Sequence, residues 1–251
     1  MTSHIKGIVN WIQEKAEKAK RPVLVVGVSG GIDSAVVSTL CSKTKLKTIV
    51  VNMPIHQDPE QIDRATYHFK WLKENFTKVE GLTIDLTNVY DEFIKNFPKG
   101  YKYNLACANS RARLRMTTLY QIAGSSQGLV VGTGNKVEDF GVGFFTKYGD
   151  GGVDISPIAD FMKSEVYEIG KELGIIDSIL QAPPTDGLWG DGRTDEDQLG
   201  VTYDELEWAM QNGDCEMDEW DDRKKEVYDI FMDFNERNQH KMEPIPIYEK
   251  K

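Results

Sequence analysis

One stretch constrains the fold of this chain more than any other, the run from residue 21 to residue 41. Val23–Val28 is a continuous, valine-rich apolar segment, which is typical of a strand buried on both faces of a sheet. Ser29–Gly31 then predict a tight turn, and Asp33 or Ser34 can cap a following helix. A strand, turn and helix in this order direct unpaired N–H groups and the positive helix end at one point. That point suits a phosphate.

Asp33 adds a metal to this prediction. A carboxylate beside a phosphate is repelled unless a cation lies between them, so we expect an ATP·Mg²⁺ site with Asp33 on the metal. The Walker motif is excluded because no Gly-Lys-Ser/Thr follows, and the dinucleotide fingerprint because Ser29 replaces its second glycine. Gly27–Gly31 does match G-x-S-x-G, which leaves a hydrolase with Ser29 as nucleophile as an alternative.

Composition narrows the class of protein. Forty acidic residues and 30 basic residues give a formal charge of −10, which argues against nucleic acid as a general partner. Cys41, Cys107 and Cys215 show no C-x-x-C spacing, so we expect free thiols in a reducing compartment. Without a signal peptide or an apolar run of membrane length, the sequence predicts a cytoplasmic protein with no membrane partner.

The remaining pattern alternates strands and helices. Further strands are expected at 46–53, 81–86, 128–133 and 155–158, and helices at 5–16, 58–76, 87–97, 104–127, 164–173, 202–210 and 221–238. This order predicts an α/β fold, a Rossmann-like doubly wound parallel sheet of about five strands with helices on both faces. We expect residues 1–251 to form one domain.

Polar residues follow the strands where ligands of such sheets bind. Gln57 lies beyond the second strand and can hydrogen-bond a nucleotide. Thr133 can contact phosphate, and Glu138 can be a second oxygen ligand of the cation or only a first-turn residue that offsets a helix dipole. Lys163 precedes a helix, where a lysine opposes the dipole unless it reaches an anion.

Two segments have the composition of loops that cover a ligand. Residues 144–154 combine Phe144 and Phe145 with a lysine, three glycines and two aspartates, which suits stacking on a flat ligand. Residues 181–200 are rich in Gly, Pro and Asp, and we interpret them as a lid over the site or as a disordered insertion. Mobile loops are therefore expected near 139–152 and 181–200.

The Ser29–Ser34 loop, Ser-Gly-Gly-Ile-Asp-Ser, resembles that of the ATP pyrophosphatases, and later motifs narrow the resemblance to the ammonia-dependent NAD synthetases. The similarity extends over Asn109–Met116, Gly132–Glu138, Gly143–Asp154, Ala182–Thr185 and His240–Lys241. The run Phe-Phe-Thr-Lys-Tyr-Gly-Asp-Gly-Gly is highly specific to that family.

The resemblance implies a reaction. The nicotinate carboxylate of deamido-NAD would attack the α-phosphate of ATP to give an adenylate and pyrophosphate, and ammonia would then displace AMP to form NAD. By position, the ATP-binding residues would be Gly27, Val28, Ser29, Gly30, Gly31, Ile32, Asp33, Ser34, Gln57, Thr133, Lys163 and Thr185. Deamido-NAD would contact Arg113, Phe144, Lys147, Asp154, His240 and Lys241.

Within the resemblance, Asp33 and Glu138 would hold Mg²⁺, and Ser29 and Asp150 would lie around the incoming ammonia, with Asp33, Ser29, Asp150 and Lys163 as the catalytic set. The family also implies a homodimer that takes free ammonia. The chain departs from many relatives at Asn52, where they carry arginine, and is about one residue longer around Glu138–Gly143. Alternatives are a tRNA-modifying ATP pyrophosphatase and a non-catalytic nucleotide sensor.

Overall fold

The computed structural model describes residues 2–185, 187, 193–213 and 220–250. Within them a parallel sheet has four strands in the order β3-β2-β1-β4. The strands are β1 (Val23–Gly27), β2 (Lys47–Asn52), β3 (Val79–Thr83) and β4 (Gly128–Val131). The predicted α/β fold with a parallel sheet flanked by helices is confirmed.

The expected fifth strand is reduced to one bridge. Val131 pairs with Ile155 in parallel fashion, and no longer ladder forms at 155–158 in the described part of the chain. Pro157 lacks the N–H that a ladder needs, so the pairing stops two residues after it begins.

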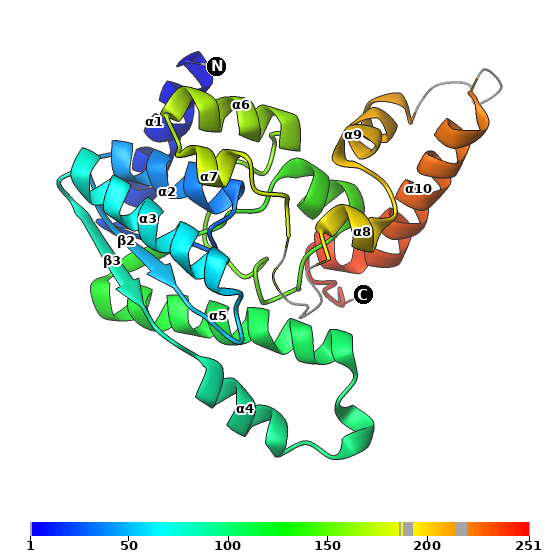
Figure 1. Cartoon of the computed structure of the whole chain (residues 1–251), viewed down its shortest axis with the longest axis horizontal. Coiled ribbons are helices and arrows are strands. Elements are labelled where there is room, and N and C mark those ends of the chain that lie inside the picture. The colour runs from blue at the N-terminus through cyan, green and yellow to red at the C-terminus, as the bar shows by residue number, and fades with distance from the viewer. Residues whose placement is uncertain (1, 186, 188–192, 214–219, 251) are drawn as a thin grey trace.

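Helices cover both faces of the sheet, as Figure 1 shows. One face carries α1 (Thr2–Ala19), α2 (Ile32–Lys43), α3 (Pro59–Asn75), α6 (Lys163–Leu173) and α7 (Asp177–Leu180). The other face carries α4 (Thr87–Lys95) and α5 (Asn104–Ser126), with the short 3₁₀ turn η1 (Lys99–Tyr101) between them. In the described residues no helix is long and apolar enough to cross a membrane.

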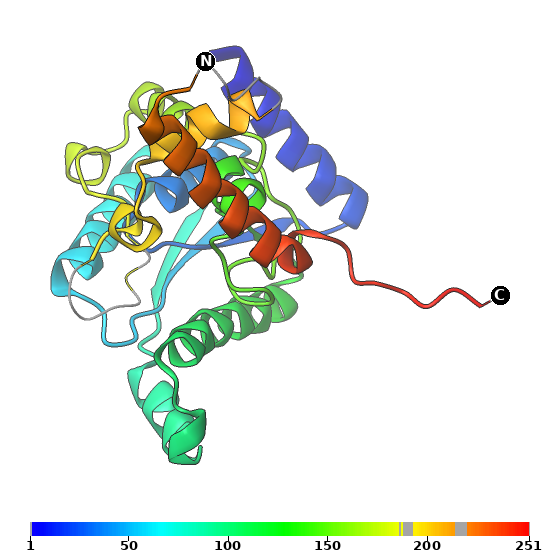
Figure 2. The same cartoon turned by 90° about the vertical axis from the view of Figure 1, so that its right-hand side faces the viewer.

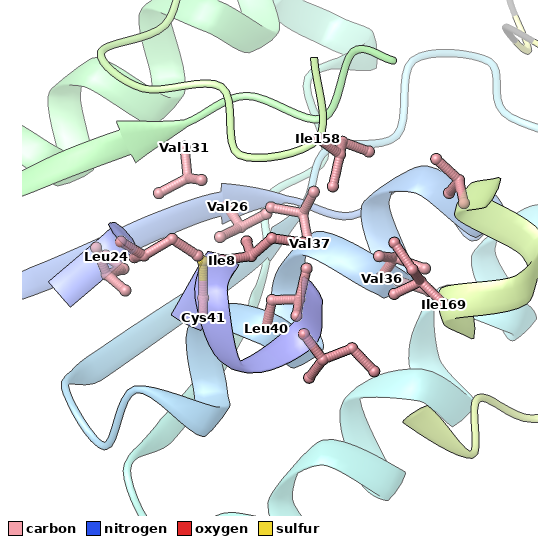
Figure 3. Close-up of a cluster of buried hydrophobic side chains, with 14 of the residues drawn as sticks. Ile8, Leu24, Val26, Val36, Val37, Leu40, Cys41, Val131, Ile158 and Ile169 are labelled. Atoms are coloured by element: carbon pink, nitrogen blue, oxygen red, sulfur yellow. The ribbon is translucent and has the colours of Figure 1, made fainter. Parts of the chain in front are cut away.

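The core follows from the alternation of side chains along β1. Leu24 and Val26 point to the α1 and α2 side, where they meet Val37 and Leu40 (Figure 3). Val25 points to the α5 side. Leu24, Val25 and Val26 are fully buried, and each such side chain stabilises the fold by about 1.5–3 kcal/mol relative to an exposed one.

A third group of helices packs beside the sheet rather than on it. It consists of α8 (Asp195–Leu199), α9 (Tyr203–Asn212) and α10 (Asp222–Met242), which share an apolar cluster with the π-helix η2 (Val137–Val142). After α10 the chain runs away from the body of the molecule (Figure 2).

The two expected loops differ in what the structure describes of them. The first begins with η2, a π-helix, which is a rare form of helix found frequently at functional sites. In the second loop, residue 186 and residues 188–192 lie outside the described residues, so the central Leu-Trp pair of the expected lid does too.

The strand order places a crevice at one edge of the sheet. After β1 the chain moves outward to β2 and β3 and then returns to β4 on the other side of β1. The connections from β1 and β4 therefore diverge, which in open α/β sheets is where ligands bind.

Candidate active site

The loop after β1 forms the expected compact turn. Gly30 has a φ of 90°, and a Cβ there would lie 2.6 Å from the carbonyl oxygen of Gln61, so only glycine fits. The Ser29 N–H donates to Ser34 Oγ and the Gly31 N–H to Ser29 Oγ, both at 3.2 Å. These hydroxyls thus satisfy two of the N–H groups expected to face phosphate.

The helix cap differs from the prediction. Gly31 is the N-cap residue of α2 and makes no side-chain cap hydrogen bond, so neither Asp33 nor Ser34 caps the helix. The Ser34 hydroxyl is occupied within the loop, where it donates to the Gly31 carbonyl. The Asp33 side chain instead turns towards α6.

Asp33 lies close to the two other charged residues predicted for the ATP site, Glu138 and Lys163. Lys163 Nζ lies 2.6 Å from Asp33 Oδ2 and 2.8 Å from Glu138 Oε1. Only 4% of the Lys163 side chain is exposed, against 18% for each carboxylate. Asp33 comes from α2, Glu138 from η2 and Lys163 from the first position of α6, so three elements meet at one ammonium group.

Neutral side chains complete this ion triad of Asp33, Glu138 and Lys163. Asn135 donates to Asp33 Oδ1 at 3.1 Å and accepts from the Glu138 N–H. The Tyr203 hydroxyl donates to Glu138 Oε1 at 2.6 Å, and its ring centroid is 4.8 Å from Lys163 Nζ. Each charge is therefore both paired and hydrogen-bonded, as a buried charge requires.

The pKa shifts in the triad have opposing causes. Burial raises the pKa of Asp33 above its ordinary value, although the Lys163 ammonium opposes the change. Burial alone would raise the pKa of Glu138, but Lys163 and the hydrogen bonds of Tyr203 and Asn135 lower it. Burial alone would lower the pKa of Lys163, but the two carboxylates raise it, so the lysine stays charged.

The donor set fits magnesium that arrives with a nucleotide. Mg²⁺ is usually held by one or two carboxylates together with substrate phosphates. Asp33 and Glu138 both border the cavity beside the loop, and among the described residues no group of three or more His, Cys, Asp or Glu could hold a metal by itself. The two carboxylates thus supply hard oxygen ligands but need further oxygens from a ligand.

One cavity of about 580 Å³ brings most of the predicted residues together. From the predicted sets it is lined by Gly27, Val28, Ser29, Gly31, Ile32, Asp33, Ser34, Gln57, Arg113, Thr133, Glu138, Phe144, Lys147, Asp150, Lys163, Thr185, His240 and Lys241. Gly30 and Asp154 do not line it. Asp154 accepts hydrogen bonds from the Tyr120 hydroxyl and the Val130 N–H, at 3.0 and 2.8 Å.

The part of the cavity lined by α5, the loop after η2 and the end of α10 is basic. Lys147 donates to the His240 carbonyl, and Arg113 donates to the Lys147 carbonyl through two nitrogens at 3.3 Å. Lys241 donates to the Phe145 carbonyl at 2.9 Å and to that of Gly143. These cations face neutral acceptors, so their positive charge is available to an anion.

The edge near β2 contains an arginine that the sequence analysis did not assign to the site. Arg115 donates to the Met53 carbonyl at 3.0 Å and to Gln57 Oε1 at 2.7 Å, and all three residues line the cavity. Asn52 lines the same edge, and its buried amide nitrogen has no hydrogen-bond partner. A guanidinium therefore stands close to Asn52, although it comes from α5.

Other functional residues also escaped the sequence analysis. Asn135 lies inside a motif that was recognised and could have been noted as a polar residue after β4. Asp139 lines the cavity, and burial together with nearby Glu138 raises its pKa well above the ordinary value. Tyr203 and Glu207 lie on α9, far in sequence from all three triad residues, and no local sequence pattern distinguishes them.

A parallel sheet with a glycine-rich loop at its switch point and an ion triad beside it defines a doubly wound α/β protein of the nucleotide-binding class. Comparison with known proteins gives the family. A model of NAD synthase matches residues 4–245, and the chain belongs to the NAD synthase family, whose members are ligases that form a carbon–nitrogen bond.

Several relatives support this membership over nearly their whole length. An NH₃-dependent NAD⁺ synthetase of Carboxydothermus hydrogenoformans is 37% identical, with 93% of this chain and 92% of the relative aligned. The NMN synthetase structure from Francisella tularensis has a TM-score of 0.87 at 31% identity, covering 98% of both chains. An NH₃-dependent NAD synthetase structure from Campylobacter jejuni has a TM-score of 0.80 at 25% identity, covering 99% of both.

Proposed function

We propose that this enzyme amidates deamido-NAD with ammonia at the expense of ATP, through an adenylated intermediate, and releases NAD, AMP and pyrophosphate. The observation that carries the proposal is one cavity with two distinct ends. The loop from Gly27 to Ser34 and the triad form one end, and the basic residues of α5, of the loop after η2 and of α10 form the other. Two phosphate-bearing substrates can therefore meet between them.

The triad end would bind ATP. The loop from Gly27 to Ser34 would hold the phosphates, while Gln57, Thr133 and Thr185 would contact the nucleotide around them. Asp33 and Glu138 would ligate Mg²⁺, which when bound neutralises charge on the phosphate oxygens. Lys163 lies between these carboxylates and would turn its ammonium to the same oxygens.

The basic end would bind the second substrate. Arg113, Lys147 and Lys241 would exchange their present carbonyl acceptors for phosphate oxygens, which form stronger charge-assisted hydrogen bonds, and His240 would contact the same substrate. Phe144 would lie near the nicotinate ring. Asp154 does not line the cavity of a single chain, so its contact would require a ligand that extends past it.

The chemistry requires no protein nucleophile, because the substrate carboxylate attacks the α-phosphate. Asp150 lines the cavity and accepts the Thr146 N–H at 3.0 Å, and with Ser29 it would receive ammonium and take a proton from it. Residues 182–185 and Asp195 border the cavity and would limit the access of water to the adenylate.

Ammonia is the proposed nitrogen donor, and a homodimer is the proposed assembly. The relatives that share most of their length with this chain carry "NH(3)-dependent" in their names. The apolar side chains that α4 and α5 expose are the proposed contact between subunits.

A second candidate acceptor is nicotinic acid mononucleotide, which would give NMN. It is favoured by one specific observation, the TM-score of 0.87 with the F. tularensis structure titled NMN synthetase, against 0.80 for the C. jejuni NAD synthetase. Both acceptors carry the same nicotinate carboxylate, so the proposed chemistry is the same for either.

The test is a product assay with matched arms. The protein, ATP and Mg²⁺ are incubated with deamido-NAD or the mononucleotide, and with ammonium or glutamine, while AMP and the amide are measured together. We expect equal amounts of AMP and NAD with ammonium, and little of either with glutamine alone. ADP in place of AMP would contradict adenylation, and faster turnover of the mononucleotide would select the second candidate.

A further inference from the structure

Helix α9 does not line the cavity at Tyr203 or Glu207, but Tyr203 contacts the triad and Glu207 contacts Ser164, the residue after Lys163. Tyr203 and Glu207 are four residues apart and therefore share one face of the helix. Both are buried, with 5% and 9% of their surface exposed. The side chains on this face reach two different elements of the active site.

Tyr203 contacts the metal side of the triad. Its hydroxyl donates to Glu138 Oε1 at 2.6 Å and lies 3.3 Å from Asp195 Oδ2. Burial and the neighbouring Glu138 carboxylate raise the pKa of Tyr203, so the phenol remains a neutral donor. Because Lys163 bonds the same Oε1 atom, that oxygen is held from two directions.

Glu207 contacts the lysine side of the triad. Its carboxylate accepts the Ser164 N–H at 2.8 Å and the Ser164 hydroxyl at 2.6 Å. Ser164 is the second residue of α6, directly after Lys163. Glu207 therefore satisfies a first-turn N–H that the helix itself cannot, and it fixes the backbone from which Lys163 projects.

We propose that the α9 face of Tyr203 and Glu207 is a positioning device that sets Glu138 and Lys163 relative to Asp33 without touching either substrate. Asp33 lies in the first turn of α2, whereas Glu138 lies in η2 and Lys163 at the first position of α6, and α9 packs against both of these elements. The geometry of the triad thus depends on packing between α9 and α6 and between α9 and η2.

Tyr203 also contacts Asp195, which connects it to the cavity-lining residues next to Thr185. Asp195 is buried, lines the cavity and faces the Tyr203 hydroxyl, and its N–H donates to the Pro184 carbonyl at 3.0 Å. A hydrogen-bonded path therefore runs from residue 184 through Asp195 and Tyr203 to Glu138. Pro184 and Asp195, which line the cavity, are thus linked to the carboxylate of Glu138 by this path.

The test uses Tyr203→Phe, which removes the hydroxyl and keeps the ring in place. It rests on the proposed Mg²⁺·ATP site, and it measures Mg²⁺ affinity by calorimetry with ATP present and the acceptor withheld. We expect Mg²⁺ binding to weaken about tenfold, the range typical when a group that orients a metal ligand is lost. Tyr228→Phe is the matched control, because the Tyr228 hydroxyl bonds only the distant Gly213 carbonyl among the described residues.

A second variant separates positioning from folding. Glu207→Gln keeps the shape of the side chain but weakens acceptance from Ser164, so we expect a higher KM for ATP with a melting temperature close to that of Tyr228→Phe. Unchanged Mg²⁺ affinity in Tyr203→Phe, or a lowered melting temperature as its only effect, overturns the proposal. If wild-type protein binds no Mg²⁺ with ATP, the metal part of the proposed function fails as well, which distinguishes the two results.

Discussion

At the scale of single residues, Lys163 is the group on which the site most depends. Its ammonium is nearly inaccessible and lies within 2.8 Å of two carboxylates. Removing one member of a buried ionic group destabilises a protein far more than replacing the whole group by apolar residues, because the remaining charges are left buried without a counter-charge. Lys163 therefore has a structural effect in the free protein as well as the proposed effect on ATP.

Lys163→Met is expected to lower the free energy of unfolding by about 3 kcal/mol near pH 7.5. The difference in unfolding free energy between wild type and variant should become smaller towards pH 5. Burial already raises the pKa of Asp33, and without the ammonium this carboxyl gains a proton more easily as the pH falls, which relieves the repulsion. Glu138 adds to the trend in the variant, because burial raises the pKa of this carboxyl and the Lys163 ammonium that opposes the rise is gone. Urea unfolding at both pH values measures this, and equal differences would contradict it.

The site residues differ in how much of their role can be predicted from their neighbours in the sequence. Asp33, Glu138 and Lys163 could be predicted because each stands at a strand end or a helix start, where side-chain chemistry is tied to backbone position. Their mutual pairing could not, because it depends on how α2, η2 and α6 meet. Tyr203 and Glu207 belong to an ordinary amphipathic helix, and only tertiary packing gives them a partner.

At the scale of elements, the sheet and its helices could be predicted from periodicity alone. The misses have local causes. Pro157 ends the expected fifth strand after one bridge, and Val137–Val142 form a π-helix, a rare conformation that the usual helical and strand periods do not predict. The position of α9 against α6 could not be foreseen, since the same apolar stripe would pack equally well elsewhere.

The exposed surface of the α4–α5 pair predicts how the subunits associate. Val89, Phe93 and Phe97 of α4 and its C-terminal flank, with Leu105 and Tyr120 of α5, expose apolar side chains on one side of the molecule. Such a patch on one face is typical of a subunit contact. We expect a homodimer at micromolar concentration in analytical ultracentrifugation.

Phe93→Glu should shift that dimer towards monomer, because it would bury a charge in the contact. Tyr67→Glu is the control, since Tyr67 is an exposed aromatic residue on α3, on the opposite side of the sheet. A wild-type monomer, or equal dissociation in both variants, would contradict the assignment of the α4–α5 face.

At the scale of the whole molecule, one cavity joins parts of the chain that fold separately. Its walls come from the sheet edge, the first turn of α2, the middle of α5, the loop after η2 and the end of α10. This arrangement places an acid–lysine cluster and a basic cluster in the same cavity, as expected if two phosphate-bearing substrates exchange a group between them.

The transfer of oxygen between those substrates is the most direct measurement of the proposed reaction. Deamido-NAD labelled with ¹⁸O at both oxygens of its nicotinate carboxylate is turned over with ATP, Mg²⁺ and ammonium, and the AMP is analysed by mass spectrometry. Attack of the carboxylate on the α-phosphate predicts one ¹⁸O atom in AMP and one retained in the amide. Unlabelled AMP, or label in inorganic phosphate instead, would contradict the adenylated intermediate.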